Sequence, residues 1–300
     1  MLKYTIKELE KVSGVKAHTI RIWEKRYNLL TPRRTDTNIR YYDNAQLKKL
    51  INVGILLENG RKISYIGNLK EEQILAEIKS IMEVEPTQKS TLHELYVKEL
   101  LVHTINFDKP GFDKTFDACI LKFGLELSIE QILYPLLNQI GQLWLSDEIN
   151  PAQEHFLSAI AKQKLFAAVD GLRPEGNSGS KFILFLPDNE DHEIGLLYAN
   201  YLLMKQGISS TYLGPRTPLE HLKTAVGVIQ PSHLLFSMTA HVSEEYSLAY
   251  FSELSQNFPD QKILVFGNIK LIPMDALAAN IMMLPTPASF KDKITKLPII

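Results

Sequence analysis

The sequence predicts a multidomain chain of mixed class, with helices over its first 170 residues and an α/β arrangement in its last third. Three observations predict this class. The first 70 residues are basic and hold two short helices around a glycine, residues 73–172 show helical periodicity, and the chain after Lys181 alternates apolar runs with amphipathic segments. We expect domains at 1–72, 73–176 and 177–300.

The composition indicates a folded protein. Of the 300 residues, 45% are hydrophobic and 22% are charged, which excludes a disordered chain. Cys119 is the only cysteine, so an intramolecular disulfide is excluded and a cysteine-based zinc site is disfavoured. The N-terminus does not resemble a signal peptide, and no apolar run approaches the roughly 18 residues of a transmembrane helix. We therefore expect a cytoplasmic protein without a membrane partner.

Charge is distributed unevenly along the chain. Residues 1–70 hold 15 Lys and Arg against 6 Asp and Glu, whereas the remaining residues hold 18 against 28. A basic first quarter on an acidic chain favours an N-terminal module that binds a polyanion, with DNA as the most plausible partner. The alternative is a basic surface that binds nothing.

Capping residues predict the first two helices. Thr5 can cap the first helix, Glu8 can complete a capping box, and Gly14 can end the helix in a tight turn. A second helix is predicted over residues 16–27. Two helices across a glycine turn are typical of a helix-turn-helix.

The second helix has an apolar face and a basic face. Ile20, Trp23 and Tyr27 recur at i, i+3 and i+7, so we expect them to face the core. The basic face shows the same spacing and holds His18, Arg21 and Lys25. A helix of this kind can lie at base edges in the major groove.

A short hairpin is predicted after the second helix. Arg33, Arg34 and Arg40 flank the turn-rich stretch Thr-Asp-Thr-Asn, and arginines on such a wing would bind phosphates. Asp43 is expected to cap a third helix that ends at Gly60.

Residues 19–43, TIRIWEKRYNLLTPRRTDTNIRYYD, resemble the winged-helix domain of MerR-type transcription regulators, and the match extends over about residues 2–72. The resemblance implies a dimer on a pseudo-palindromic stretch of double-stranded operator DNA. The residues that it implies at the DNA are His18, Thr19, Arg21, Lys25, Arg26, Arg33, Arg34, Arg40 and Tyr41.

Residues 73–172 predict a bundle of four or five helices. Trp144 ends one long helix, and Glu154 and His155 begin the next after an Asn150-Pro151 cap. In an antiparallel hairpin these three residues can meet at one edge of the bundle. On the residues alone, the alternative is a capping carboxylate beside an exposed histidine and a half-buried tryptophan.

The last third predicts a doubly wound parallel sheet of Rossmann-like class. Strand-like apolar runs alternate with helical segments, and a closing helix follows the last run. The strands are expected at 181–187, 208–214, 233–238, 262–267 and 280–285. Neither a Gly-x-Gly-x-x-Gly nor a Walker motif is present, which disfavours a dinucleotide and a nucleoside triphosphate.

The loop that follows the first of these strands, PDNEDHEIGLL, holds His192 among carboxylates. Ligands of parallel sheets bind at the carboxyl ends of strands, where Gly214, Ser237 and Gly267 are also expected. The histidine could ligate a metal while a carboxylate holds its other nitrogen, or act as a general base, or be solvated. No nucleophile is paired with it, which favours ligation over base catalysis.

A helical bundle followed in sequence by an α/β domain with a histidine loop of this form is similar to cobalamin-binding modules. With a MerR-type domain at the N-terminus, the chain resembles the CarH/LitR group of light-responsive repressors. The resemblance implies cobalamin, as adenosylcobalamin or methylcobalamin, with cobalt bound from below by His192. The family has a tryptophan followed, after nine residues, by Glu-His over the upper face of the cofactor. This sequence matches that pattern with Trp144 and Glu154-His155. The remaining cofactor-binding positions are Glu190, Asp191, Gly195, Ser237, Thr239, Gly267 and Asn268.

Four positions depart from the family pattern. Glu190 replaces an aspartate that accepts from the imidazole, and Ser237-Met238-Thr239 replaces Ser-x-Leu. Gly267-Asn268 replaces a glycine pair that lies close to the nucleotide tail of the cofactor. Leu145 follows the tryptophan where light-responsive members have histidine.

These resemblances imply a transcription regulator and not an enzyme, with a cobalamin controlling its activity or its assembly as a dimer or tetramer, in response to light in the better-known members. One alternative is a regulator that has lost the cofactor and uses the fold for oligomerisation or protein contacts. Another is a corrinoid-dependent enzyme component, which the basic head disfavours.

Overall fold

The structure is a computed structural model, which describes residues 4–34, 38–83, 89–145, 149–172, 180–238, 244–267, 277–284 and 287–296. It divides into two compact units, Met1–Ala159 and Ile160–Ile300. Among the residues described, no helix has the length and apolar character needed to span a bilayer.

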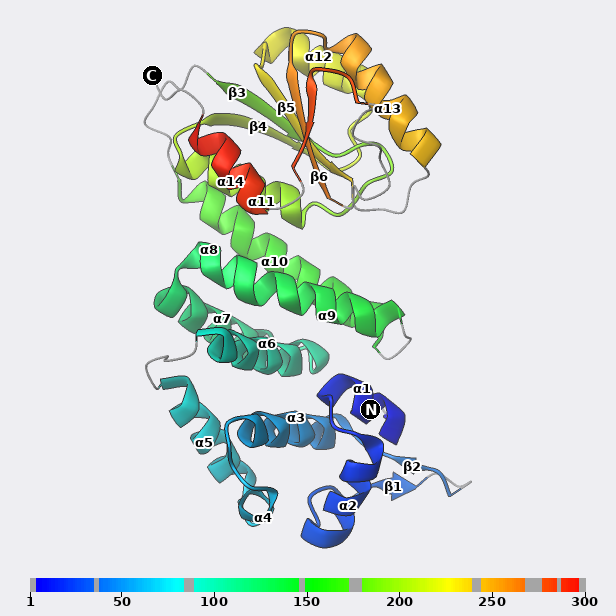
Figure 1. Ribbon diagram of the computed structural model, residues 1–300, viewed down its shortest axis with the longest axis vertical. Coiled ribbons are helices and arrows are strands. Elements are labelled where there is room, and N and C mark those ends of the chain that lie inside the picture. The colour runs from blue at the N-terminus through cyan, green and yellow to red at the C-terminus, as the bar shows by residue number, and fades with distance from the viewer. Residues whose placement is uncertain are drawn as a thin grey trace. The chain divides into compact units, whose positions relative to one another are not determined.

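The N-terminal part of the first unit contains the predicted helices and hairpin (Figure 1). Its elements are α1 (Ile6–Ser13), α2 (Ala17–Tyr27), β1 (Arg33–Arg34), β2 (Arg40–Tyr41), α3 (Asn44–Glu58), α4 (Ile63–Ile66) and α5 (Glu71–Glu83). The Thr5–Glu8 capping box is formed, and Gly14 ends α1 in the left-handed conformation, with φ of 73°. Asp43 caps α3 by accepting from the backbone N–H of Gln46 at 3.1 Å. These capping predictions are confirmed.

A buried tyrosine joins the hairpin to α2. Tyr42 follows β2, is fully buried, and donates its hydroxyl to Glu24 Oε1 at 2.5 Å. Its backbone also pairs with that of Tyr4 through two hydrogen bonds of 2.8 Å. The end of the wing is therefore tied by Tyr42 to the second helix and to Tyr4, which precedes the first helix.

Helix α5 packs on α3, within the N-terminal part of the unit. Glu77 on α5 accepts from Arg61 Nε at 2.8 Å and from the Tyr65 hydroxyl at 3.1 Å. These bonds fix α5 to the segment that follows α3.

The helices after residue 89 form a bundle as expected, but α5, which was expected to be its first helix, packs on α3 instead. They are α6 (Lys89–Ile105), α7 (Lys109–Phe123), α8 (Leu125–Ser128), the π-helical turn η1 (Ile129–Leu133), α9 (Tyr134–Leu145) and α10 (Pro151–Asp170). The long helix expected to end near Trp144 runs through α8, η1 and α9. Pro135 lies two residues after the π-helical turn, and a proline cannot donate to a regular α-helical ladder.

The second unit contains a five-stranded sheet within its described residues. Its elements are β3 (Lys181–Phe185), α11 (Ile194–Lys205), β4 (Ser209–Gly214), α12 (Leu219–Ile229), β5 (His233–Met238), α13 (Glu244–Asn257), β6 (Lys262–Gly267), β7 (Ile281–Met283) and α14 (Pro287–Thr295). All neighbouring strands are parallel, in the order β4-β3-β5-β6-β7. The predicted doubly wound sheet is confirmed.

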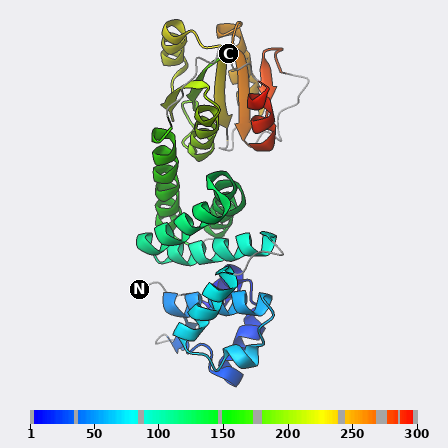
Figure 2. The same ribbon diagram turned by 90° about the vertical axis from the view of Figure 1, so that its left-hand side faces the viewer.

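Helices cover both faces of this sheet (Figures 1 and 2). Helices α12 and α13 pack on one face, where Phe185, Phe236 and Phe251 belong to one buried apolar cluster. Helices α11 and α14 contact each other on the other face. The chain runs from β3 outward to β4 and then returns to β5 on the other side of β3. The carboxyl ends of β3 and β5 therefore flank the point where such sheets bind ligands.

Candidate functional site

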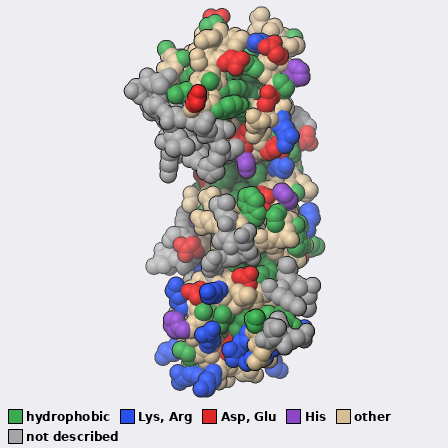
Figure 3. Space-filling view, turned by 90° about the vertical axis from the view of Figure 1, so that its right-hand side faces the viewer, with side chains coloured by type: hydrophobic (Ala, Val, Ile, Leu, Met, Phe, Trp, Pro, Cys, Tyr) green, Lys and Arg blue, Asp and Glu red, His purple; other side chains and the backbone are tan. Residues whose placement is uncertain are grey.

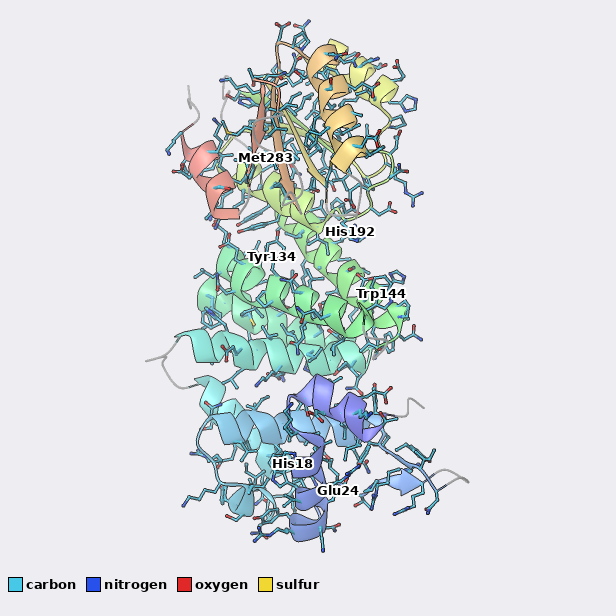
Figure 4. The ribbon with its side chains drawn as sticks, turned by 45° about the vertical axis from the view of Figure 1, so that its right-hand side comes forward. His18, Glu24, Tyr134, Trp144, His192 and Met283 are labelled. Carbon is cyan, nitrogen blue, oxygen red and sulfur yellow. The ribbon has the colours of Figure 1, made fainter. Side chains whose placement is uncertain are left out.

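The outward face of α2 is basic, as predicted. His18, Arg21, Lys25 and Arg26 are exposed, whereas Ile20 and Trp23 are buried. Figure 3 shows Lys and Arg side chains gathered over the N-terminal elements, and Figure 4 labels His18 and Glu24 on α2. Tyr27, predicted in the core, is half-buried and packs against Gly67. The assignment of Trp23 to the core is confirmed.

The hairpin presents arginines to solvent. Arg33 pairs in register with Tyr41, and Arg34 pairs with Arg40. All three arginines are exposed, and Arg34 Nη1 donates to Asn38 Oδ1 at 2.6 Å. The predicted wing is therefore formed by two short antiparallel strands that carry the three arginines.

Two exposed isoleucines lie among these basic residues and were not predicted as site residues. Ile22 on α2 is 46% exposed, and Ile39 beside β2 is 60% exposed. A helical wheel of α2 could have identified Ile22, because this residue falls outside the buried stripe of Ile20 and Trp23.

The predicted cap at the start of α10 is formed. Asn150 Oδ1 accepts from the backbone N–H of Ala152 at 2.9 Å, and Gln153 Oε1 accepts from the backbone N–H of Asn150 at 2.9 Å. Glu154 in the first turn lies 3.0 Å from His155 Nδ1, and Ser158 donates its hydroxyl to the same carboxylate. Sequence reasoning missed Ser158, which lies one helical turn after Glu154.

Trp144 lies in the last turn of α9 and is 47% exposed (Figure 4). A large aromatic side chain with half its surface in solvent is available to pack on a flat ligand. The assignment of Trp144, Glu154 and His155 to one binding surface stays a prediction.

His192 lies in the loop between β3 and α11 and is held by Glu190. Its Nδ1 is 2.6 Å from Glu190 Oε1, and its backbone N–H donates to the same oxygen at 2.9 Å. The Glu190 side chain is 4% exposed, whereas the imidazole is 70% exposed (Figure 4). Because a carboxylate can only accept, Nδ1 carries the proton and the neutral tautomer has an unprotonated Nε2. This tautomer is the one that can ligate a metal through Nε2.

The carboxylates beside His192 have different partners. Asp191 accepts from Arg216 Nε and Nη2, each at 2.7 Å, and these hydrogen bonds hold the pKa of Asp191 below its ordinary value. Glu193 accepts from the Tyr212 hydroxyl at 2.8 Å and lies 3.2 Å from Lys162 Nζ. Arg216, Tyr212 and Lys162 were not predicted, because they lie far from this loop in sequence.

Ser237 near the end of β5 is fully buried. Its Oγ contacts no donor or acceptor in the part of the chain that the structure describes. In register beside it lies Phe266 on β6. A buried hydroxyl without a partner carries a free-energy cost, so this position suits a polar group supplied by a ligand.

Gly195 allows α11 to approach the sheet closely. A Cβ at this residue would lie 2.9 Å from Cε2 of Phe266. The glycine in the His-x-x-Gly loop therefore has a packing reason that is visible in this chain. Gly267, also predicted to bind the cofactor, ends β6, whereas Thr239 and Asn268 lie outside the described residues.

A metal at His192 would need further ligands from a cofactor. Within the described ranges, no group of three or more His, Cys, Asp or Glu side chains could hold a metal ion. A single histidine on an exposed loop therefore suits a metal that arrives inside a macrocycle, which supplies the other ligands itself.

Comparisons with known proteins find family matches to the N-terminal elements and to the helical bundle. Residues 4–73 match the family described as MerR HTH family regulatory protein, and residues 96–168 match the family described as B12 binding domain. The HTH-type transcriptional repressor CarH of Myxococcus xanthus is 29% identical over 257 residues, which are 85% of each chain. The HTH-type transcriptional repressor CarA of the same organism is 26% identical over 81% of this chain and 79% of its own.

Two further similarities each cover part of the chain. The HTH-type transcriptional regulator MlrA of Escherichia coli is 32% identical over 69 residues, 23% of this chain and 28% of its own. A solved structure of the monomethylamine corrinoid protein of Methanosarcina barkeri matches with a TM-score of 0.55 at 14% identity, covering 67% of this chain and 97% of that chain. At this identity the structural match shows the fold alone.

Proposed function

We propose that this chain, a MerR-type transcription regulator with a B12-binding domain, binds operator DNA under the control of a bound cobalamin. The observation that carries the proposal is the pairing of His192 with a buried carboxylate at the carboxyl edge of the sheet. In this proposal the chain acts as a regulator and not as an enzyme. Because a gene regulator must reach DNA, we place it in the cytoplasm.

The proposed role of His192 is to ligate the cobalt of a cobalamin through Nε2. Glu190 holds the ring in the required tautomer, and its burial fixes the direction of the imidazole. The Ser237 hydroxyl would donate to or accept from the tail of the cofactor, and Gly195 keeps α11 close to the sheet. When bound, a cobalamin would supply a cobalt centre capable of ligand exchange and of absorbing visible light.

The proposed role of the N-terminal elements is to bind the operator as a dimer or tetramer. The outward residues of α2 would lie in the major groove, and the arginines of the hairpin would contact phosphates. Cobalamin can change DNA affinity only if it binds the assembly states of the protein with different affinities.

The test is to measure DNA binding and corrinoid binding by the same preparation. Full-length protein is incubated with adenosylcobalamin in darkness, and binding to duplexes selected from a random library is measured before and after illumination. We expect a bound-corrinoid absorption spectrum and a change in operator affinity on adding the cofactor. DNA binding without any corrinoid spectrum would instead indicate a fold that has lost its cofactor. Corrinoid binding without DNA binding would favour an enzyme component.

Arg40→Ala is expected to reduce the salt dependence of DNA binding. Arg40 is exposed on the wing, so its removal should lower the slope of log K against log salt by about 0.9 for each phosphate that is no longer neutralised. The affinity should fall similarly on all sequences. Fluorescence anisotropy at several salt concentrations measures both, with Lys114→Ala, an exposed lysine on α7, as the control. Equal slopes for the two variants would contradict the binding of a phosphate by Arg40.

Glu190→Ala is expected to weaken adenosylcobalamin binding about 10- to 100-fold, because the imidazole loses the acceptor that orients it. The cobalt–imidazole spectrum should persist at saturating cofactor, since His192 remains. Spectroscopic titration measures the affinity, and Glu220→Ala, an exposed carboxylate of the same unit, is the matched control. An affinity equal to that of the control would remove Glu190 from the site.

A further inference from the structure

Ile22 lies among the basic residues of the α2 surface. On a helix, residues three and four positions apart are neighbours. His18 lies four residues before Ile22, and Lys25 and Arg26 lie three and four residues after it. All three polar neighbours are exposed, so the isoleucine is surrounded by the side chains that the proposed function assigns to DNA.

The exposure of Ile22 differs from that of the other apolar residues of α2. Ile20 is fully buried and Trp23 is 9% exposed, whereas Ile22 keeps 46% of its surface in solvent. Isolated exposed apolar residues are common on protein surfaces. The position of Ile22 is distinctive because its neighbours would carry it to the base edges when α2 enters the major groove.

The major groove offers one apolar group, which is the C5-methyl of thymine. A β-branched side chain suits this contact because it has few χ1 rotamers in a helix and loses little freedom when it is covered. Cytosine presents a hydrogen at the same position. Contact with Ile22 would therefore distinguish thymine from cytosine, which the basic neighbours cannot do by charge.

We propose that Ile22 reads a thymine methyl group in each half-site of the operator, and so contributes sequence specificity that the basic residues do not supply. This inference rests on the proposed function, because it requires α2 to bind in the major groove. It goes beyond that function by naming an apolar residue and the base group that the residue recognises.

The experiment removes the methyl group from the DNA and its partner from the protein. Duplexes selected by the full-length protein are resynthesised with each thymine replaced in turn by deoxyuridine, and their affinities are measured by fluorescence anisotropy. We expect one position per half-site at which the replacement weakens binding by the unmutated protein about fourfold, the size expected for one buried methyl. For Ile22→Ala, the same replacement should have almost no effect, and Ile22→Val should be intermediate.

Ile39→Ala is the matched control, because it removes another exposed isoleucine from the same domain. In Ile39→Ala, deoxyuridine should still weaken binding fully at the position where it has almost no effect on Ile22→Ala. The inference is overturned if no replacement affects the unmutated protein, or if the penalties are unchanged in Ile22→Ala. If Ile22→Ala changed the oligomeric state of the protein in solution, and no thymine methyl group affected the DNA affinity, the residue would instead belong to a protein contact. Absence of any selected sequence would count against the proposed function itself.

Discussion

His192→Ala is expected to bind adenosylcobalamin about 100-fold more weakly or worse, and to lose the absorption spectrum of a cobalt–imidazole bond. The magnitude follows from metal sites in which even the loss of an outer hydrogen-bond partner costs 10- to 100-fold, so that loss of the ligand itself should cost at least as much. The geometry favours a specific effect, because the ring is exposed and held only 2.6 Å from a buried carboxylate.

His221→Ala is the matched control for this variant. His221 is exposed on α12 of the same unit, so the substitution removes an imidazole of similar exposure that lies elsewhere in the fold. Spectroscopic titration in darkness gives the affinity and the spectrum together. Thermal unfolding adds a second readout, because a ligand stabilises the folded state by RT ln(1 + [L]/Kd). A His192→Ala spectrum and melting shift equal to those of His221→Ala would remove cobalt ligation from the proposal.

The central strands β3 and β5 could be predicted because they are buried on both faces and mostly apolar. β5, for example, is buried along its whole length, from His233 to Met238. Such strands appear in the sequence as short continuous apolar runs between turn residues. Because the His192 loop follows the first of these strands, it was predicted to lie at the edge of the sheet formed by the carboxyl ends of the strands. The order of the strands could not be predicted, because it depends on which edge each helix crosses.

The partners of the loop carboxylates could not be predicted either. Arg216 binds Asp191 from 25 positions away, and Tyr212 binds Glu193 from 19 positions away. Both partners lie at or just after the end of β4, so the pairing of β3 with β4 creates these contacts. Glu190 was predictable, because it stands two residues before the histidine and needs no partner strand to reach it.

The surface of α2 shows a different limit. Apolar periodicity identifies what a helix buries, and it correctly placed Trp23 inside. It gives no role to an apolar residue that lies off the buried stripe, and Ile22 was therefore absent from the predicted interface. The structure shows that Ile22 is exposed among basic neighbours, and the proposed contact with DNA rests on this exposure.

Gly267→Ala is expected to destabilise the second unit by about 3 kcal/mol or more, even without a cofactor. Gly267 ends β6 with φ of 123°, where side chains are strained, and a Cβ there would lie 2.3 Å from the carbonyl oxygen of Met238. Since the obstacle is the backbone of the neighbouring strand, no side-chain rotation can relieve the contact. The melting temperature should fall by about 6–12 °C, at roughly 2–4 °C for each kcal/mol.

Gly207→Ala separates strain from collision in this test. Gly207 has φ of 71°, and a Cβ there would meet nothing within 4 Å. The substitution should therefore cost only the left-handed conformation, about 1–2 kcal/mol. A similar melting temperature for the two variants would show that β5 yields to the added methyl group. If Gly267 served only the approach of the cofactor, as the family resemblance implies, Gly267→Ala would lower cobalamin affinity and leave the cofactor-free protein as stable as before. The 2.3 Å approach to Met238 leads us to expect the opposite, with stability reduced first and affinity reduced as its consequence.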